Sequence, residues 1–430
     1  MKVLIVGGGG REHAIADNVR RSKHKPEIIC APGNAGTGTF AENVPISADN
    51  IDDLLTLAKE RNVDLTIVGP EAPLCAGIVD AFQAADLRIF GPTAEAARIE
   101  GDKAYAKELL VEASIPTARG KCFTRFEDAH TYIATRDSPQ VIKASGLAAG
   151  KGVVVCDDPS DALIEAERMM VDKKFGDAGL SIVVEEKLVG QELSVHAIVD
   201  GRNIHVLATS QDHKAIGDGD TGPNTGGMGA YSPAPIATAD VLRAVESQVI
   251  VPIIDTLRRR GVTYRGVLYC GLMVTAAGPR VLEFNCRFGD PETQVIFARL
   301  KTDFIDIANA CIDGTLDEIT LDWDPRPAVC VVMTSRGYPG AYEKGKPISG
   351  LEEASAMSDV TVYHAGTATV ARRVITSGGR VLGCTALGDT IRSARDLAYE
   401  AVARIDFEGA YVRRDIGHRA LTDGTIASSA

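Results

Sequence analysis

The first third of the chain alternates apolar, strand-like runs with helix-like segments. Residues 3–6, 27–30 and 65–68 are the strand-like runs, and residues 12–21 and 51–61 between them read as helices. Strands that alternate with helices are typical of βαβ units, in which successive strands lie parallel. The N-terminal region is therefore predicted to be a parallel α/β domain.

Four glycines at residues 7–10 lie where the first strand meets the first helix, which suggests a dinucleotide site. The fingerprint Gly-x-Gly-x-x-Gly is absent, because Glu12 and His13 occupy the positions where its third glycine would lie. The second strand also ends without an acidic residue for a ribose. A helix N-terminus still binds a phosphate well. His13 could contact such a group, or it could cap or pack the helix.

Residues 281–294 contain the strongest pattern for a functional site. An apolar pair continues as a strand in which Glu283 and Asn285 lie two residues apart, so their side chains leave the same face. Hard oxygen ligands in small number suit Mg²⁺, which completes its octahedron with waters and phosphates. Arg287 comes next on that face and offers a planar fork to a phosphoryl or carboxylate oxygen. The alternative is a strand that ends in a solvated polar loop.

A glycine-rich loop is flanked by strand-like residues 139–142 and 153–155. Glycines permit positive φ and close approach of backbone N–H groups to an anion, and lysines add charge. The loop is not a Walker A motif, because a glycine replaces the required Ser or Thr and a strand follows instead of a helix. We predict a nucleotide-phosphate loop of another kind. Its lysines and glycines are Lys143, Gly146, Gly150, Lys151 and Gly152.

Residues 182–194 carry a further pattern that fits a nucleotide. Three apolar residues lead into Glu185 and Glu186, followed by Leu188, a glycine and Glu192. The backbone of such a segment can bind an adenine edge, and a carboxylate beyond it can accept from ribose hydroxyls. Glutamate pairs alone are usually solvated surface, so this pattern has meaning only in combination with the others.

The order and spacing of these features resemble the ATP-grasp ligases, and most closely the phosphoribosylamine–glycine ligase (glycinamide ribonucleotide synthetase) family. The ATP-grasp part of the resemblance begins at Lys107 and Lys143. Further matching segments extend the resemblance almost from one end of the chain to the other. Its longest motifs are highly specific. The matching segments are residues 8–14, 32–37, 68–74, 115–118, 211–214, 222–231, 283–294, 337–340, 364–367 and 414–417.

The resemblance implies ATP-dependent ligation of glycine to 5-phosphoribosylamine through an acyl phosphate, in purine synthesis. It implies a multidomain α/β and α+β fold: an α/β substrate domain at residues 1–103, an ATP-grasp domain at 104–325 and an α+β domain at 326–424. A lid subdomain is expected at about 120–192. The larger half, which carries the metal ligands, is expected to have a mixed sheet.

The resemblance also implies roles for single residues. Asp290 would orient the glycine amine or Arg287, and Glu292 would be either catalytic or part of a solvated loop. The metal ligands would be Glu283 and Asn285, for Mg²⁺ or Mn²⁺, and the catalytic residues Arg287, Asp290 and Lys214. The ATP-binding residues would be Lys107, Lys143, Gly150, Lys151, Gly152, Glu185, Glu186, Leu188 and Glu192. The substrate-binding residues would be Gly9, Gly10, Glu71, Asp212, Lys214, Asn224, Thr225 and Gly227.

Two positions depart from the family pattern. Ala215 follows Asp-His-Lys where arginine is usual, which puts one phosphate or carboxylate contact in doubt. Ser145 stands where many members carry aspartate, although serine also occurs, which weakens any claim that an acid at that position is essential. Composition alone would favour a mobile surface loop for residues 211–231, whereas the resemblance makes this segment line the acceptor site. His364 is interpreted as architectural, because no nucleophile accompanies it.

Composition fits a cytoplasmic enzyme that acts on small molecules. A net charge of −12 does not favour binding to nucleic acid or to an anionic membrane, and no apolar run reaches the length of a membrane span. The nine scattered cysteines indicate reduced thiols, and Cys286 should point away from the metal-binding face. Two alternatives stay open: another ATP-grasp carboxylate–amine ligase, and a noncatalytic or NAD-binding α/β protein.

Overall fold

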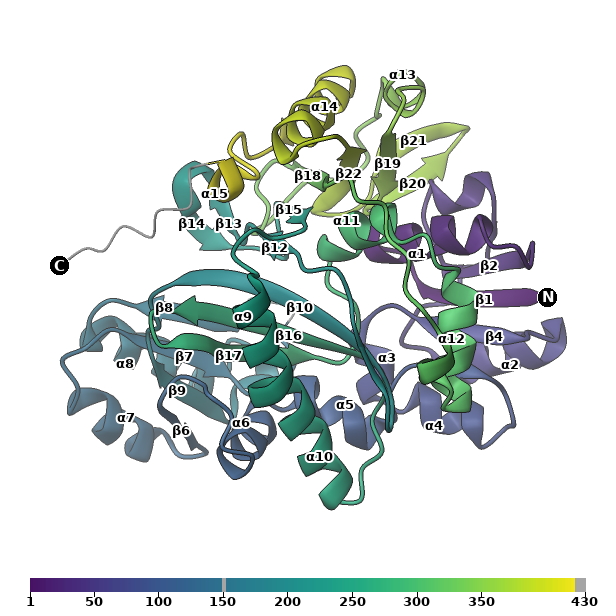
Figure 1. The fold of residues 1–430 in the computed structure, drawn as a ribbon. Helices are drawn as coiled ribbons and strands as arrows, with labels where there is room; N and C mark the ends of the chain where they lie inside the picture. Colours follow the sequence, from purple (N-terminus) through teal and green to yellow (C-terminus); the bar gives the residue numbers. More distant parts are fainter. Residues whose placement is uncertain (149–151, 422–430) are drawn as a thin grey trace.

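In the computed structural model, which describes residues 1–148 and 152–421, the N-terminal region is built on a five-stranded sheet (Figure 1). All its pairings are parallel, in the order β3-β2-β1-β4-β5, so the predicted parallel domain is confirmed. Its elements are β1 (Lys2–Gly7), α1 (Gly10–Arg20), β2 (Glu27–Pro32), β3 (Glu42–Asn43), α2 (Ile51–Arg61), β4 (Leu65–Val68), α3 (Glu71–Cys75), α4 (Ile78–Gln83) and β5 (Ile89–Phe90).

Local sequence explains these elements well. The four central residues of β1 are apolar and fully buried, as in a parallel sheet covered on both faces. Helix α2 begins where the Asn50 side chain accepts from the Asp53 backbone N–H, and it ends at Asn62, which adopts a left-handed conformation with φ of 51°.

The predicted lid is a four-stranded antiparallel sheet in the order β6-β9-β7-β8, packed against two helices. Its elements are β6 (Gly120–Phe123), α7 (Phe126–Ala134), β7 (Gln140–Ala144), β8 (Val153–Cys156), α8 (Pro159–Met170) and β9 (Ile182–Glu186). It has its own hydrophobic cluster, which supports a body able to move as a unit. That cluster includes Ala129, Ile133, Ile142, Ala162, Ala166, Met169, Ile182 and Val184.

The larger half of the ATP-grasp region holds a second four-stranded sheet, β11-β10-β16-β17. The expected mixed sheet is wrong, because all pairings in its ladder are antiparallel; Thr117 and Val281 form an isolated parallel bridge at its side. Its strands are β10 (Gln191–Asp200), β11 (Ile204–Val206), β16 (Arg265–Thr275) and β17 (Gly278–Asn285). Helix α5 (Ala94–Gly101) ends the N-terminal part of the chain, and the helices that follow are α6 (Lys103–Glu112), α9 (Ala239–Val245), α10 (Val251–Arg259), α11 (Glu292–Arg299) and α12 (Phe304–Asp313).

The C-terminal region forms a sheet that also takes strands from residues 211–232. The order is β12-β15-β18-β22-β19, and β23 pairs with β18. The two ends of the segment implied to bind the acceptor thus belong to the C-terminal sheet, whereas its middle forms a separate hairpin of β13 and β14 with residues 218–224 exposed. The elements are β12 (Gln211–Asp212), β13 (Ala215–Gly217), β14 (Thr221–Asn224), β15 (Gly229–Ser232), β18 (Ala328–Ser335), α13 (Leu351–Ser355), β19 (Val360–His364), β20 (Thr367–Val370), β21 (Arg373–Thr376), β22 (Arg380–Leu387), α14 (Ile391–Arg404), β23 (Ala410–Tyr411) and α15 (His418–Leu421).

Figure 1 shows these parts around a common centre, with the lid beside the large sheet and the C-terminal sheet across from both. None of the helices among residues 1–148 and 152–421 combines the length and the apolar character needed to cross a bilayer.

Candidate active site

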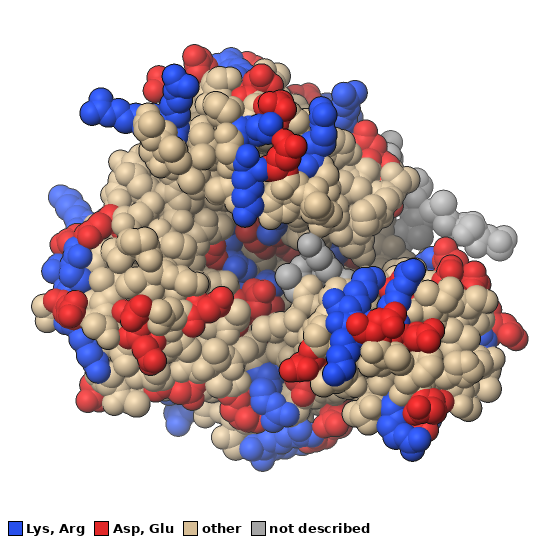
Figure 2. Space-filling model, turned by 180° about the vertical axis from the view of Figure 1, so that it is seen from behind, with Lys and Arg blue, Asp and Glu red and all other residues tan. Residues whose placement is uncertain are grey.

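A cavity of about 580 Å³ lies where the lid, the large sheet and residues 212–226 meet. Figure 2 shows a hollow on this face of the molecule, with both acidic and basic side chains inside it. Most of the residues predicted from the sequence line this one cavity. They are Glu71, Lys107, Lys143, Gly152, Glu185, Glu186, Leu188, Glu192, Asp212, Lys214, Asn224, Thr225, Glu283, Asn285, Arg287 and Asp290. The predicted Gly150 and Lys151 lie outside the described residues.

Strand β17 carries Glu283 and Asn285 to the cavity wall, as the alternation of side chains predicted. Cys286 is buried and is not among the described residues that line the cavity. Burial alone would raise the pKa of Glu283, but Lys214, whose Nζ lies 3.5 Å from Oε1, and other lysines lower it overall. Glu283 is therefore an ionised carboxylate that faces cationic side chains, and its oxygens are of the type that bind metal ions.

Glu185 lies between the two lysines predicted to contact phosphates. Its Oε1 is 2.6 Å from Lys107 Nζ, and its Oε2 is 2.7 Å from Lys143 Nζ, with all three side chains buried. Burial would raise the pKa of Glu185, but the two ammonium groups lower it overall. The Glu185 carboxylate is therefore paired with both lysines at the cavity wall, and its contact with the nucleotide stays a prediction.

Lys214 occupies the centre of the opposite wall. Its Nζ lies 3.2 Å from Glu192 Oε2 as well as 3.5 Å from Glu283, and these carboxylates raise its pKa although burial opposes the shift. Asp212 is buried nearby, and burial raises the pKa of its carboxyl to about 8. This wall therefore pairs a fixed cation with an acid that holds its proton near neutrality.

The segment that carries Asp212 and Lys214 is held by the C-terminal region. The Gly417 N–H donates to Nε2 of the buried His213 (3.1 Å), and burial lowers the pKa of that imidazole to about 3. The carbonyl of Ala215 accepts from Arg413 Nη1 at 3.0 Å. Ala215 thus offers its backbone to a structural contact, and its short side chain is buried.

Arg287 differs from the sequence-based expectation. Its fork is already paired inside the protein: Nε donates to Glu71 Oε2 (3.1 Å), and Nη2 lies 2.8 Å from Glu100 Oε1. Burial would raise the pKa of Glu71, yet Arg287 and Arg11 lower it to about 2. The guanidinium is therefore a fixed charge in the cavity wall.

Asp290 and Glu292 also have partners that the sequence did not reveal. The suggested pairing of Asp290 with Arg287 is wrong, because Asp290 Oδ2 lies 3.4 Å from Arg380 Nη2 and Oδ1 accepts from Gln294 at 2.8 Å. Glu292 is not in a solvated loop. It begins α11, is buried, and accepts from Ser194 Oγ at 3.1 Å.

Three glycines predicted to bind substrate are not among the described residues that line the cavity. A Cβ on Gly10 would lie 2.6 Å from Gln294 Nε2, and one on Gly227, whose φ is +116°, would lie 2.4 Å from Pro291 Cδ. Glycine is therefore required at position 227 by its backbone conformation and a rigid neighbour, whereas the neighbour of Gly10 is the end of a side chain. The Gly9 N–H donates to Glu12 Oε2 at 2.5 Å, at the N-terminus of α1. For His13, packing is the observed role, since it contacts Phe40, Tyr363 and His364.

Comparison with known proteins identifies the family of the chain that has this geometry. Residues 1–100, 101–293 and 328–419 match the N, ATP-grasp (A) and C domains of phosphoribosylglycinamide synthetase. The chain belongs to this family. A phosphoribosylamine–glycine ligase of Rhodopirellula baltica is 53% identical over 97% of this chain and 98% of the relative. One from Pseudomonas aeruginosa is 50% identical over 98% of both chains.

Solved structures agree with the family. The crystal structure of phosphoribosylamine–glycine ligase from Thermotoga maritima matches with a TM-score of 0.83 and 35% identity, covering 97% of this chain and all of that one. The biotin carboxylase domain of 2-oxoglutarate carboxylase from Hydrogenobacter thermophilus matches with a TM-score of 0.73 and 14% identity, over 96% and 91% of the chains. The second likeness shows a shared fold only.

Sequence reasoning missed five charged residues among the described residues that line the cavity of this family member: Arg11, Glu100, Lys103, Lys187 and Arg380. Two of them could have been found. Lys103 lies four residues before Lys107 on α6 and therefore shares its helix face, and Lys187 lies between the predicted Glu186 and Leu188. No local pattern points to the other three, which reach the cavity from distant parts of the chain.

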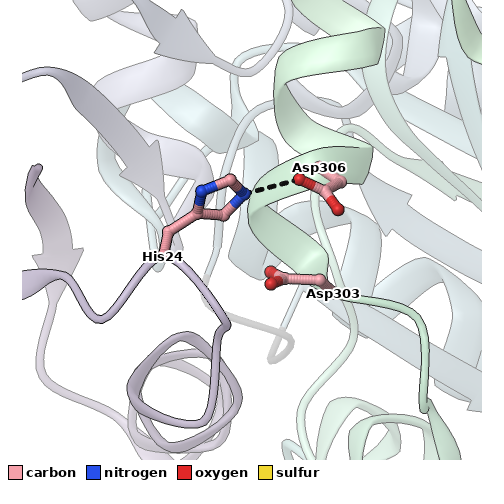
Figure 3. A group of neighbouring side chains, drawn as sticks. All are labelled: His24, Asp303 and Asp306. Atoms are coloured by element: carbon pink, nitrogen blue, oxygen red, sulfur yellow. Dashed lines mark hydrogen bonds and ion pairs between the residues drawn. The ribbon is translucent and has the colours of Figure 1, made fainter.

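A second group of ligand-type side chains lies on the surface, between the α1–β2 loop and α12 (Figure 3). His24 Nε2 lies 2.6 Å from Asp306 Oδ1, and Lys23 Nζ lies 2.6 Å from Asp306 Oδ2. Asp303 caps α12 through Oδ1 and accepts from Ser22 Oγ through Oδ2 (2.7 Å). All four carboxylate oxygens thus accept from protein donors, so this group joins two elements rather than forming a metal centre.

Proposed function

We propose that this chain catalyses the ATP-dependent ligation of glycine to 5-phosphoribosylamine, which gives glycinamide ribonucleotide, ADP and phosphate in purine biosynthesis. The observation that carries the proposal is that one cavity joins the lysines of the nucleotide motifs to the acceptor segment at Asp212 and Asn224. Relatives named phosphoribosylamine–glycine ligase, similar over almost their whole length, support the same reaction.

A free carboxylate is a poor electrophile, so the reaction must activate glycine first. A glycine carboxylate oxygen attacks the γ-phosphorus of ATP in line, the bond to the β–γ bridging oxygen breaks, and ADP leaves. The amine of phosphoribosylamine then attacks the carbonyl carbon of glycyl phosphate. Phosphate departs with the electron pair of the C–O bond, and the amine loses a proton.

The protein contributes mainly positioning and charge in the first step. Lys107 and Lys143, held by Glu185, bring positive charge to the nucleotide phosphates. The backbone of residues 186–188 and the Glu192 carboxylate are proposed to bind the nucleoside. Arg287 supplies a fixed positive charge near the transferred group, where charge in a partly dry site has its largest effect.

Glu283 and Asn285 fit a divalent cation by the chemistry of their donors. Both are oxygen ligands on one face of β17, and the ion-pair partner of Glu283 among the described residues is the ammonium group of Lys214. Mg²⁺ and Mn²⁺ both accept such ligands. When bound, the ion would neutralise charge on the phosphates. Asp212, Lys214, Asn224 and Thr225 are proposed to bind glycine and phosphoribosylamine.

The lid is proposed to exclude water from the acyl phosphate. It carries Gly152 and Leu188 into the cavity wall and is built as a separate sheet with its own core. We further propose a cytoplasmic location, supported by nine cysteines that are all free thiols.

The test is a coupled assay of ADP release with freshly generated phosphoribosylamine, with glycine omitted in the control. We expect ADP release to depend on both substrates, and glycinamide ribonucleotide to form in equal amount. ADP release with another acid and amine pair, and none with this pair, would contradict the proposal. Tight binding of NAD(H) without ATP binding would contradict the whole class.

A further inference from the structure

Glu100, near the end of α5, is a buried acid that none of the proposed steps uses. Its side chain lies against the end of β17, the strand that carries the proposed metal ligands. A carboxylate so deeply buried needs donors to offset its lost hydration.

Three consecutive residues supply those donors. The backbone N–H of Cys286 donates to Glu100 Oε2 at 2.7 Å, and Arg287 Nη2 lies 2.8 Å from Oε1. The side-chain amide nitrogen of Asn285 also lies 3.0 Å from Oε1 once the amide is assigned by its hydrogen bonds. One carboxylate thus contacts each residue from 285 to 287.

The contact with Asn285 decides which way its amide points. An amide can bind a cation only through its oxygen. The Asn285 nitrogen is directed to two acceptors, Glu100 Oε1 and the Phe284 carbonyl (3.1 Å), so Oδ1 is left on the opposite side of the group. Asn285 itself lines the cavity.

The three groups that contact Glu100 are all donors: a backbone N–H, a side-chain amide and a guanidinium. Glu100 therefore accepts in each of these contacts, and an acceptor at this place fixes a donor amide in one orientation.

We infer that Glu100 is a positioning residue: it turns the Asn285 oxygen toward the divalent cation and holds Arg287 beside the transferred phosphoryl group. This inference rests on the proposed function, because it takes Glu283 and Asn285 as the cation ligands. Partners that orient metal ligands are typically worth about 10–100-fold in metal affinity or activity. The link would also join α5 to the catalytic strand.

The test compares Glu100→Gln with the wild-type protein in ADP binding by calorimetry, with Mg²⁺ and with EDTA. Free Mn²⁺ in the presence of ADP is followed by electron paramagnetic resonance. Glu95→Gln is the matched control, since Glu95 lies on the same helix, is exposed, and has Arg98 as its ion-pair partner among the described residues. We expect Glu100→Gln to weaken Mn²⁺ binding about 10–100-fold, with ADP affinity in EDTA unchanged and Glu95→Gln like wild type.

The outcomes separate this inference from the proposed function. If wild-type protein binds no ADP, or binds it equally with and without metal, the proposed function fails. If metal strengthens ADP binding in wild type and equally in Glu100→Gln, the positioning role is wrong.

A double variant tests the hydrogen bond itself. When Glu100→Gln is combined with Asn285→Asp, the introduced glutamine amide can donate to a carboxylate whose two oxygens are both possible ligands, so Mn²⁺ affinity should recover relative to Glu100→Gln alone. Continued loss in the double variant would contradict the orientation argument. If Glu100→Gln does not fold, Glu100→Asp keeps the charge but shortens the reach, and Mn²⁺ affinity equal to wild type would then overturn the inference.

Discussion

Two acidic groups of this molecule contain the same kinds of ligand atoms, but their surroundings differ. In the cavity, Glu283 is partly exposed and faces lysines, and its nearest ion-pair contact among the described residues is Lys214 Nζ at 3.5 Å. On the surface, His24 and Lys23 approach Asp306 to 2.6 Å, and Asp303 caps a helix. The cavity acid therefore has one long ion-pair contact, whereas each oxygen of the surface acids already has a short contact with a protein donor.

The difference teaches that ligand type and proximity do not define a metal site. What matters is whether folding leaves the oxygens available after the protein's own donors are counted. The place of Glu283 in a cavity wall adds the second condition, because electrostatic interactions strengthen where the surrounding protein displaces water. Changes to the cavity acid should therefore affect chemistry, and changes to the surface acids should affect little.

The largest effect is expected for Glu283→Gln, which removes the charge and keeps the shape. Turnover should fall by more than about 10³-fold, beyond the loss typical for one oxyanion-hole donor, while the unfolding transition stays cooperative. Steady-state ADP release measures the turnover, and thermal unfolding measures the cooperativity of the unfolding transition. The exposed Glu127→Gln, on the lid helix α7, is the control. Wild-type activity of Glu283→Gln at ordinary Mg²⁺ concentrations would contradict the comparison.

The next effect concerns Arg287→Lys. Lysine keeps the charge but cannot pair with Glu71 and Glu100 through a planar fork. We expect single-turnover rates to fall about 10²–10³-fold, with ATP affinity little changed. The exposed Arg243→Lys serves as control. Unchanged chemistry with weaker ATP binding would make Arg287 a nucleotide anchor instead of a catalytic charge.

Much of this organisation could be predicted because it depends on local patterns. Apolar runs indicated the strands of the parallel sheet, and α2 occupies the predicted range of 51–61. Alternation along one strand sufficed to bring Glu283 and Asn285 into one cavity. The resemblance, rather than the residues alone, supplied the reaction and the acceptor segment.

The remainder depends on contacts that no local pattern encodes. Glu100 contacts Cys286 across 186 positions of the chain, and Arg380 reaches the carbonyl of Asp290 across 90. From the sequence, the guanidinium of Arg287 was expected to be free for a ligand, because its partner Glu71 lies 216 positions away along the chain. Charge pairing of this kind is decided by tertiary packing, so sequence reasoning missed Glu100 and Arg380 and treated the guanidinium of Arg287 as free for substrate.

A third prediction uses pH on Asp212, a buried acid whose pKa burial raises to about 8. Between about pH 4 and 8 the folded protein holds a proton that the unfolded chain has released, so stability falls as pH rises through this window. Asp212→Asn should remove up to about 4 kcal/mol of this pH dependence between pH 5 and 8, because each pH unit in the window contributes about 1.4 kcal/mol. Denaturant unfolding of ligand-free protein at pH 5 and 8.5 measures it.

The control for that experiment is the exposed Asp240→Asn, which should keep the wild-type slope. If the stability of Asp212→Asn depends on pH as strongly as that of the wild type, another group holds the proton. The cavity would then contain an ionised Asp212 beside Lys214, and the acceptor wall would resemble the surface group more closely than the comparison allows.

The smallest effect is expected for Asp306→Asn in the surface group. Burial opposes the shift, but hydrogen bonds from His24 and Lys23 lower the pKa of Asp306, and all three side chains are partly exposed. Exposed pairs contribute about 0.2–1 kcal/mol, so unfolding should shift by less than about 1 kcal/mol and turnover should not change. Thermal unfolding with and without Mn²⁺, in the absence of nucleotide, is the measurement. If Mn²⁺ raises the melting temperature of the wild type and not of Asp306→Asn, the His24 group binds metal despite its satisfied oxygens, and availability after folding is the wrong criterion.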